Sequence, residues 1–182
     1  MVQSQVIRPN NQFLKEACST IDPKINHCFQ CKKCTNGCPL TFAMDIMPNQ
    51  VMRLITLGQK DEVLQSKTIW VCASCQTCTT RCPNDIDIAH VMDGMRRLCR
   101  KEGFQPAEDA VPKFHDAFLA AIKSRGRVNE LEMILRYKLR TRNIIADLML
   151  GLKMFRKGRM KLFGHRVKGL KEIKSIFNRS KV

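Results

Sequence analysis

The sequence contains Cys28-Phe-Gln-Cys31-Lys-Lys-Cys34-Thr-Asn-Gly-Cys38-Pro39, and the same spacing returns 44 positions later as Cys72-Ala-Ser-Cys75-Gln-Thr-Cys78-Thr-Thr-Arg-Cys82-Pro83. Each run reads C-x2-C-x2-C-x3-C-P, a spacing by which proteins bind [4Fe–4S] clusters. Three cysteines at intervals of three allow one short loop to reach three corners of an iron–sulfur cube. The fourth cysteine, just before proline, ligates the other cluster when two are present.

The repeat therefore predicts two clusters with crossed ligands. One cluster is assigned to Cys28, Cys31, Cys34 and Cys82, and the other to Cys72, Cys75, Cys78 and Cys38. Because Cys34 and Cys38 are four residues apart, their Cα atoms are separated by at most about 14 Å, so the clusters must be close neighbours. Structural zinc usually takes two separated pairs of ligands and fits this spacing less well.

Charge divides the 182 residues into two parts. Residues 1–122 carry 14 basic and 12 acidic side chains, whereas residues 123–182 carry 18 and 4.

The chain contains no run of about 18 apolar residues that would predict a membrane span. Its first residues show no secretory signal, so we expect a cytoplasmic protein whose thiols stay reduced and bind metal rather than form disulfides.

Apolar periodicity predicts an all-α protein with almost no strand signal. We expect an N-terminal lead-in over 1–27, a two-cluster domain over 28–103 and a basic helical extension over 104–182. The expected helices cover 12–18, 48–57, 61–66, 88–102, 112–125, 128–135, 144–155 and 170–177.

The side chains outside the two runs predict no catalytic centre. Cys99 lies on the apolar stripe of its expected helix and is interpreted as a small buried thiol, whereas Cys18 receives no role. Trp70 is expected in the core beside a cluster, and His27 in a solvated loop.

The sequence shows no dinucleotide-binding glycine pattern and no nucleophilic triad. A cube held by four cysteines has no open coordination position, so the sequence predicts electron transfer without catalysis.

Two further stretches resemble the iron–sulfur C subunit of the heterodisulfide reductases of methanogenic archaea. They are Met47-Pro-Asn-Gln-Val-Met-Arg-Leu-Ile and Ser66-Lys-Thr-Ile-Trp joined to the second cysteine run, and the similarity extends with less specificity through Gly126-Arg-Val-Asn-Glu-Leu-Glu and Leu150-Gly-Leu-Lys-Met. The resemblance implies an α-helical ferredoxin-like domain. It also implies that the chain is an electron-relay subunit of a soluble complex.

The resemblance further implies which partners the chain has. A flavin-containing subunit of heterodisulfide reductase would supply electrons. A separate disulfide-reducing subunit would reduce the disulfide of coenzyme M and coenzyme B. These proteins would form a larger hetero-oligomer with a hydrogenase or formate dehydrogenase.

Other functions stay open on the sequence alone. Related respiratory or sulfur-metabolism reductases use similar iron–sulfur subunits. The basic C-terminal third could bind nucleic acid through phosphates, although one Tyr and one Trp leave little for base stacking. A free ferredoxin-like carrier would not need the long extension. Residues 152–177 mix apolar and basic side chains, which suits either a membrane surface or, as we favour, partner subunits.

Overall fold

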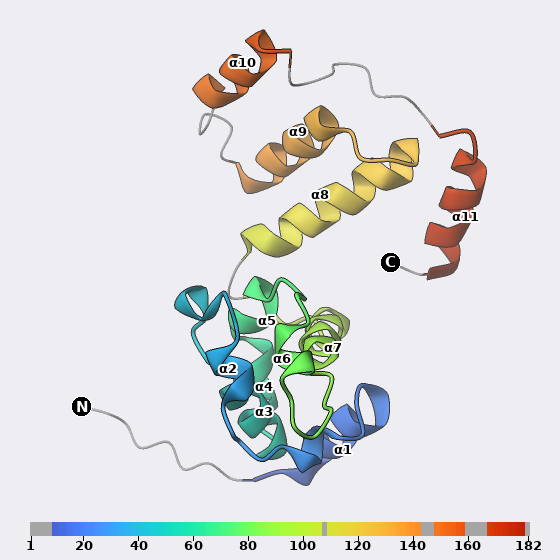
Figure 1. Ribbon diagram of the computed structural model, residues 1–182. Helices are drawn as coiled ribbons and strands as arrows, with labels where there is room; N and C mark the ends of the chain where they lie inside the picture. The colour runs from blue at the N-terminus through green and yellow to red at the C-terminus, as the bar shows by residue number, and fades with distance from the viewer. Residues whose placement is uncertain (1–8, 107–108, 143–147, 159–166, 181–182) are drawn as a thin grey trace. The chain divides into compact units, whose positions relative to one another are not determined.

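The computed structural model describes residues 9–106, 109–142, 148–158 and 167–180. In these ranges the chain forms α-helices, short 3-10 helices and loops, with no strand, which confirms the all-α prediction. The chain divides into two compact units, Met1–Asp109 and Ala110–Val182 (Figure 1). None of the described helices is long and apolar enough to cross a membrane.

The first unit is built from short elements around two longer helices, α3 and α7. Its elements are α1 (Asn11–Thr20), η1 (Ile25–His27), α2 (Lys33–Asn36), η2 (Thr41–Ala43), α3 (Pro48–Thr56), α4 (Lys60–Leu64), α5 (Thr68–Val71), α6 (Thr77–Thr80) and α7 (Ile88–Lys101).

Helix α7 provides the largest share of the core. It begins where the Asp87 carboxylate accepts a hydrogen bond from the backbone N–H of His90, which satisfies one of the free donors at the helix start. Its apolar side chains then recur every three or four residues, so that one face packs inward. The buried members of this face include Val91, Met92, Met95 and Cys99.

The N-terminal segment packs against the same core. Phe13, Ala17 and Ile25 are at most 3% exposed. The Lys60 ammonium group joins the segment to the body, because its Nζ lies 3.1 Å from Glu16 on α1 and 2.5 Å from Glu102 just after α7. Residues 9–27 therefore contribute to the core of the first unit.

The second unit pairs α8 (Ala110–Arg125) with α9 (Glu130–Thr141), and also contains α10 (Leu148–Arg156) and α11 (Leu170–Ser180). The Glu132 carboxylate joins the pair by accepting hydrogen bonds from Ser124 at 2.7 Å and Arg125 at 2.7 Å. The segment before α11 meets the end of α8, where the N–H of Val167 donates to the carbonyl of Arg125 at 3.1 Å.

The helices expected from periodicity are present, with shifted ends. Helix α9 begins two residues later than expected because Asn129 caps it, accepting from the N–H of Glu132, and it continues to Thr141. Helix α8 begins at Ala110, which places Pro112 in its first turn. The start of the helix expected over 144–155 lies outside the described residues, and α10 begins at Leu148.

Candidate functional site: two cysteine-lined cavities

The two cysteine runs adopt the same backbone conformation. The first cysteines have nearly equal dihedral angles, with φ −68° and ψ 115° at Cys28 and φ −57° and ψ 117° at Cys72. Four positions later, Lys32 and Gln76 are both left-handed, with φ 62° and 64°. The sequence repeat is therefore also a repeat of structure.

Left-handed residues bend each loop around a cavity. Besides Lys32 and Gln76, the non-glycine residues Gln30 and Ser74 also have positive φ, at 56° and 52°. Such residues are uncommon and tend to occur where a loop forms a binding site. Alternation of left-handed with ordinary residues turns successive N–H groups toward a common centre, a geometry seen around phosphates and iron–sulfur clusters.

A short helix then carries the fourth cysteine of each run away from its own loop. Helix α2 follows the first loop and α6 the second, and these two helices contact each other. Cys38 and Cys82 leave the helices in the same way, each N–H donating at 3.1 Å to a threonine carbonyl, of Thr35 and Thr79 respectively. Because the helices lie side by side, each fourth cysteine reaches the neighbouring loop.

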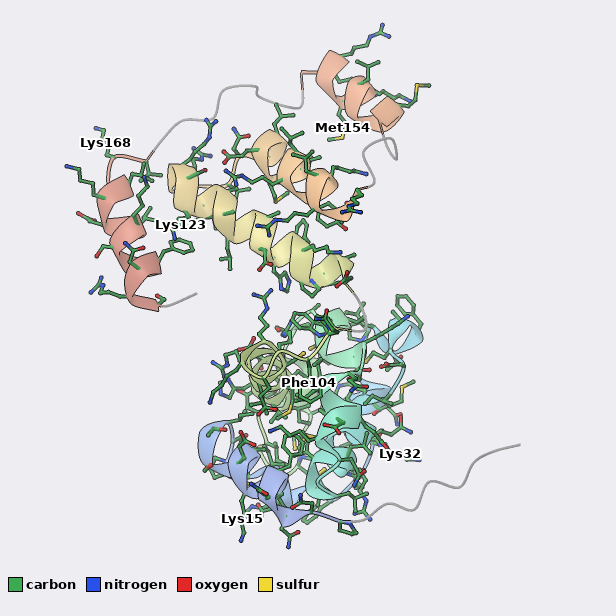
Figure 2. The ribbon with its side chains drawn as sticks, turned by 180° about the vertical axis from the view of Figure 1, so that it is seen from behind. Lys15, Lys32, Phe104, Lys123, Met154 and Lys168 are labelled. Carbon is green, nitrogen blue, oxygen red and sulfur yellow. The ribbon has the colours of Figure 1, made fainter. Side chains whose placement is uncertain are left out.

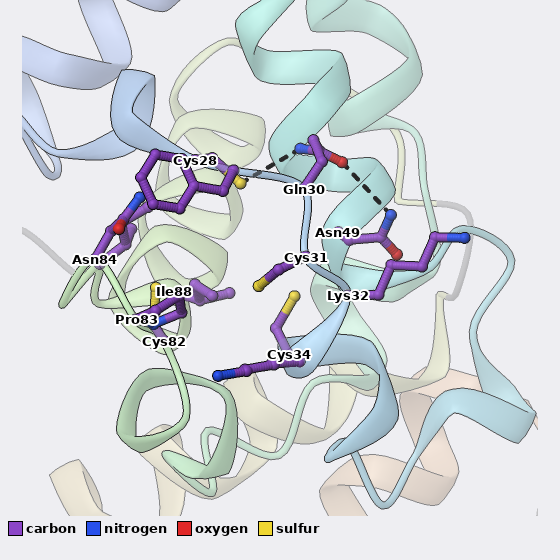
Figure 3. Close-up of a pocket in the computed structure, with 13 residues that line it drawn as sticks. Cys28, Gln30, Cys31, Lys32, Cys34, Asn49, Cys82, Pro83, Asn84 and Ile88 are labelled. Carbon is purple, nitrogen blue, oxygen red and sulfur yellow. Dashed lines mark hydrogen bonds between the residues drawn. The ribbon is translucent and has the colours of Figure 1, made fainter.

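Each cavity is consequently lined by four cysteines drawn from both runs. Cys28, Cys31, Cys34 and Cys82 line the first cavity (Figure 3). The second cavity is lined by Cys72, Cys75, Cys78 and Cys38. The structure thus brings together the two sets of cysteines that the spacing predicted, while cluster ligation by each residue stays a prediction.

The chemistry of these donors fits iron–sulfur clusters. All ten cysteines have free thiols. In the described part of the chain, no group of three or more His, Cys, Asp or Glu side chains is arranged to hold a single metal ion. The cysteines are instead distributed around a cavity, with the sulfurs of Cys31 and Cys34 directed into it (Figure 3). Thiolate sulfur is the usual ligand of such clusters.

Burial disfavours the thiolate form of two of these cysteines. Burial raises the pKa of the Cys34 thiol and raises that of Cys78 to about 11. A hydrogen bond with the Thr77 hydroxyl, 3.4 Å from Sγ, instead lowers the pKa of Cys75. Because the ligands bind iron as thiolates, cluster binding must release protons from Cys34 and Cys78.

Several polar side chains that the sequence did not single out hold the cysteine loops in place. The Gln30 side-chain amide donates to the Cys28 sulfur at 3.3 Å (Figure 3). The Arg96 guanidinium, from α7, donates to the carbonyl of Cys72 at 3.2 Å and to the Ser74 hydroxyl at 2.8 Å. The position of Gln30 inside the motif was the only available sequence signal, since Arg96 reaches its loop from 24 residues away.

Asp45 positions the second loop indirectly, through the helix α5 that precedes it. Its carboxylate accepts hydrogen bonds from the N–H of Lys67 at 2.8 Å and from the N–H of Thr68 at 3.1 Å, at the start of α5. Partial burial acts to raise its pKa, but these hydrogen bonds outweigh that effect and the pKa is lowered. Helix α5 ends at Val71, directly before Cys72, so Asp45 fixes the approach to the first cysteine of the second loop.

Cys99 and Trp70 are buried as predicted, and His27 is exposed as predicted but ends the 3-10 helix η1 rather than lying in a loop. Cys99 is fully buried and Trp70 is 2% exposed. The Arg100 guanidinium lies 5.7 Å from the centre of the Trp70 ring. Cys18 is half-buried on α1 and lines neither cysteine cavity.

Comparison with known proteins identifies the domain. Residues 27–87 match a family described as a 4Fe-4S dicluster domain. All eight cysteines of the two runs fall within these residues. The chain therefore has two [4Fe–4S] clusters as its cofactors, as the sequence predicted.

Two curated relatives have sequences similar to 62% and 52% of this chain. The C subunit of the H(2):CoB-CoM heterodisulfide,ferredoxin reductase of Methanothermobacter marburgensis is 32% identical over 116 residues, covering 62% of this chain and 63% of the relative. The iron-sulfur C subunit of the CoB--CoM heterodisulfide reductase of Methanopyrus kandleri is 32% identical over 103 residues, covering 52% and 54%. The chain thus spans less than two thirds of each relative's length.

The chain is an iron–sulfur electron-transfer protein similar to the C subunit of heterodisulfide reductase, which confirms the resemblance noted from the sequence.

Proposed function

We propose that this chain relays electrons inside a soluble heterodisulfide reductase complex. Electrons would pass from a flavin-containing subunit, through the two [4Fe–4S] clusters, to a subunit that reduces the disulfide of coenzyme M and coenzyme B. The observation that carries the proposal is the pair of adjacent cavities, each lined by four cysteines from both runs. The names of the relatives support the choice of complex.

The cysteines have one task in this proposal, which is to hold the clusters close together. Cys28, Cys31, Cys34 and Cys82 would hold one cluster, and Cys72, Cys75, Cys78 and Cys38 the other. When bound, each cluster supplies reversible one-electron oxidation and reduction. Four thiolates leave no coordination position for a substrate, so the chain would pass electrons without performing the disulfide chemistry.

The remaining side chains exclude water and fix the loops. Buried Met92 and the neighbouring Ala89 close the second cavity from the side of α7. Ile88, the first residue of α7, and Ile86, just before the helix, close the first cavity. Cys31 and Cys75, the middle cysteines of the two loops, are exposed. Each proposed cluster therefore has one corner at the protein surface, where a partner could exchange electrons with it.

A second candidate belongs to the same class of function. In this alternative the chain is the iron–sulfur subunit of a related respiratory or sulfur-metabolism reductase. The cluster arrangement is the same in both cases, and the partner subunits distinguish them.

Purification of the native complex under anaerobic conditions tests the proposal. We expect two subunits, one that contains flavin and one that reduces disulfides, to copurify with the chain, together with a hydrogenase or formate dehydrogenase. We also expect the complex to reduce the disulfide of coenzyme M and coenzyme B. A complex that copurifies but reduces only another substrate would favour the related reductase. A chain isolated with duplex DNA and no redox partner would contradict both.

A further inference from the structure

The two cysteine cavities differ in the charge around them although their backbones repeat. The described residues that line the first cavity include Lys32 and Lys33 and no acidic side chain. Those that line the second cavity include no charged side chain at all. Arg96 approaches the second loop, but its side chain is only 12% exposed and is hydrogen-bonded to that loop. Among these lining residues, exposed positive charge therefore flanks the first cavity alone.

The two lysines of the first loop lie at the protein surface. Both are exposed, and within the described residues neither forms an ion pair. Lys32 extends away from the sulfurs of Cys31 and Cys34 (Figure 3) and lies at the surface of the first unit (Figure 2). Unpaired exposed cations contribute little to folding, but they attract an oppositely charged surface from a distance.

An exposed aromatic ring accompanies these charges. Phe29 lies between Cys28 and Cys31 and is 74% exposed. Its counterpart in the second loop is Ala73. A large apolar ring exposed beside positive charges is typical of the anchor residues in protein interfaces. Phe29 is thus well placed to make the short-range contact after the lysines have guided an encounter.

We propose that Phe29, Cys31, Lys32 and Lys33, together called the first-loop face, form the docking surface for an acidic electron-transfer protein. This inference rests on the proposed function as an electron relay. One electron passes between the partner's redox group and the cluster of the first cavity, so that one is oxidised while the other is reduced. No bond breaks and no proton is transferred.

The repeat itself supplies the substitutions for a test. Gln76 occupies the left-handed position that corresponds to Lys32, so Lys32→Gln introduces a side chain that the same backbone already accommodates. Phe29→Ala copies Ala73 in the same way, and Lys33→Gln removes the second charge. Lys15→Gln combined with Lys101→Gln is the matched control, because it removes two exposed lysines from α1 and α7.

Stopped-flow reduction of the cluster-loaded full chain measures the effect. The acidic protein probe is flavodoxin hydroquinone, and the small neutral reductant is photoreduced deazaflavin. At low salt we expect the triple variant of the first-loop face to react about tenfold more slowly with flavodoxin, with a weaker dependence on ionic strength. The reaction with deazaflavin should not change. Equal slowing by the control variant, or no slowing by the triple variant, would overturn the proposal.

Placing the substituted first-loop side chains on the second loop instead is a control against a folding artefact. Adding Ala73→Phe and Gln76→Lys to the triple variant should recover much of the lost rate with flavodoxin, because the second loop then presents a similar face. Failure to recover, with both clusters intact, would contradict docking by this chemistry. Unchanged flavodoxin kinetics with weaker binding to duplex DNA would show a nucleic-acid surface instead. If neither reductant reduces the clusters, the proposed relay function itself fails.

Discussion

Nη1 of Arg96 donates a hydrogen bond to the main-chain carbonyl of Cys72 at 3.2 Å, which ties the longest core helix of the first unit to the second cysteine loop. The same guanidinium also holds Ser74, a left-handed residue of that loop. A left-handed backbone is unfavourable for residues other than glycine. The hydrogen bond to Ser74 therefore helps to hold the loop in this conformation. A positive charge beside a cluster also favours its reduced, more negative form.

Replacement of Arg96 should therefore affect one cluster and spare the other. We expect Arg96→Met to destabilise the second loop by about 2 kcal/mol, since hydrogen bonds from a charged donor are lost. The variant should release one cluster faster and show a lower reduction potential for it. Visible absorbance and a redox titration monitored by EPR measure the two effects. Arg97→Met is the control, because the neighbouring Arg97 side chain is 60% exposed; an equal effect there would contradict the role of Arg96.

Crossed ligation can be tested one cysteine at a time. We expect Cys82→Ser to damage the cluster assigned to Cys28, Cys31 and Cys34, because Cys82 lines the first cavity. Iron content should fall from about eight atoms per chain to about four. Cys38→Ser is the matched variant and should damage the other cluster. The cluster that remains in Cys82→Ser should give an EPR spectrum different from that of the cluster that remains in Cys38→Ser. Loss, in each variant, of the cluster bound by the three other cysteines of the same run would refute crossed ligation.

Removal of iron should unfold much of the first unit. Both cysteine loops contain left-handed residues, and the helices that flank them are short, with four residues each in α2, α5 and α6. Helices of this length do not persist by themselves. We expect the chelated protein to lose far-UV circular dichroism and its cooperative melt, since cluster binding contributes folding free energy. An iron-free chain with a native spectrum would contradict this prediction.

The Lys60 contacts predict a dependence of α1 docking on alkaline pH. Burial acts to lower the pKa of Lys60, but hydrogen bonds to Glu102 and Glu16 outweigh it, and the pKa is raised. A raised pKa in the folded state means that the stabilisation is complete below the unfolded pKa of about 10.5. It is lost as the pH rises through the folded pKa. Hydrogen exchange of α1 should accelerate there, and Lys60→Met should remove about 1 kcal/mol at neutral pH and abolish this dependence.

The C-terminal unit is expected to bind partners without holding clusters. Its residues 123–182 carry 18 basic and 4 acidic side chains. A truncation of the chain tests this expectation. Truncation after Gly126 would remove α9 and leave α8 without the helix that packs against it through Glu132. The chain should therefore be truncated after Asp109, at the boundary between the two compact units. We expect residues 1–109 to keep both clusters but to lose assembly with the flavin-containing or disulfide-reducing partner.

Iron content together with copurification measures this outcome. A control chain that lacks only α11 should retain the α8–α9 pair. A truncated chain that assembles normally and passes electrons at the full rate would assign the basic unit another task. Salt-sensitive binding of the intact chain to DNA at physiological ionic strength would then favour the nucleic-acid interpretation.

The sequence by itself determined the features that depend on local spacing. Three cysteines at intervals of three define each loop, and the apolar period of residues 88–99 defines α7, because both patterns act through near neighbours in the chain. The resemblance to heterodisulfide reductases rested on residues beside the second run in the same way. Short elements such as α2, α5 and α6 carry too few residues for a periodic signal, so only the structure showed them.

Contacts between distant residues were decided by the tertiary structure. The contact of α2 with α6 brings Cys38 and Cys82 to opposite cavities, and 44 residues separate these two cysteines. Arg96 contacts the second loop from 24 residues away, and Asp45 contacts the start of α5 from 22 residues away, with no periodicity that could indicate either. The difference in charge between the cavities also needed the fold, because a side chain's distance from a cluster depends on packing between segments that the sequence leaves apart.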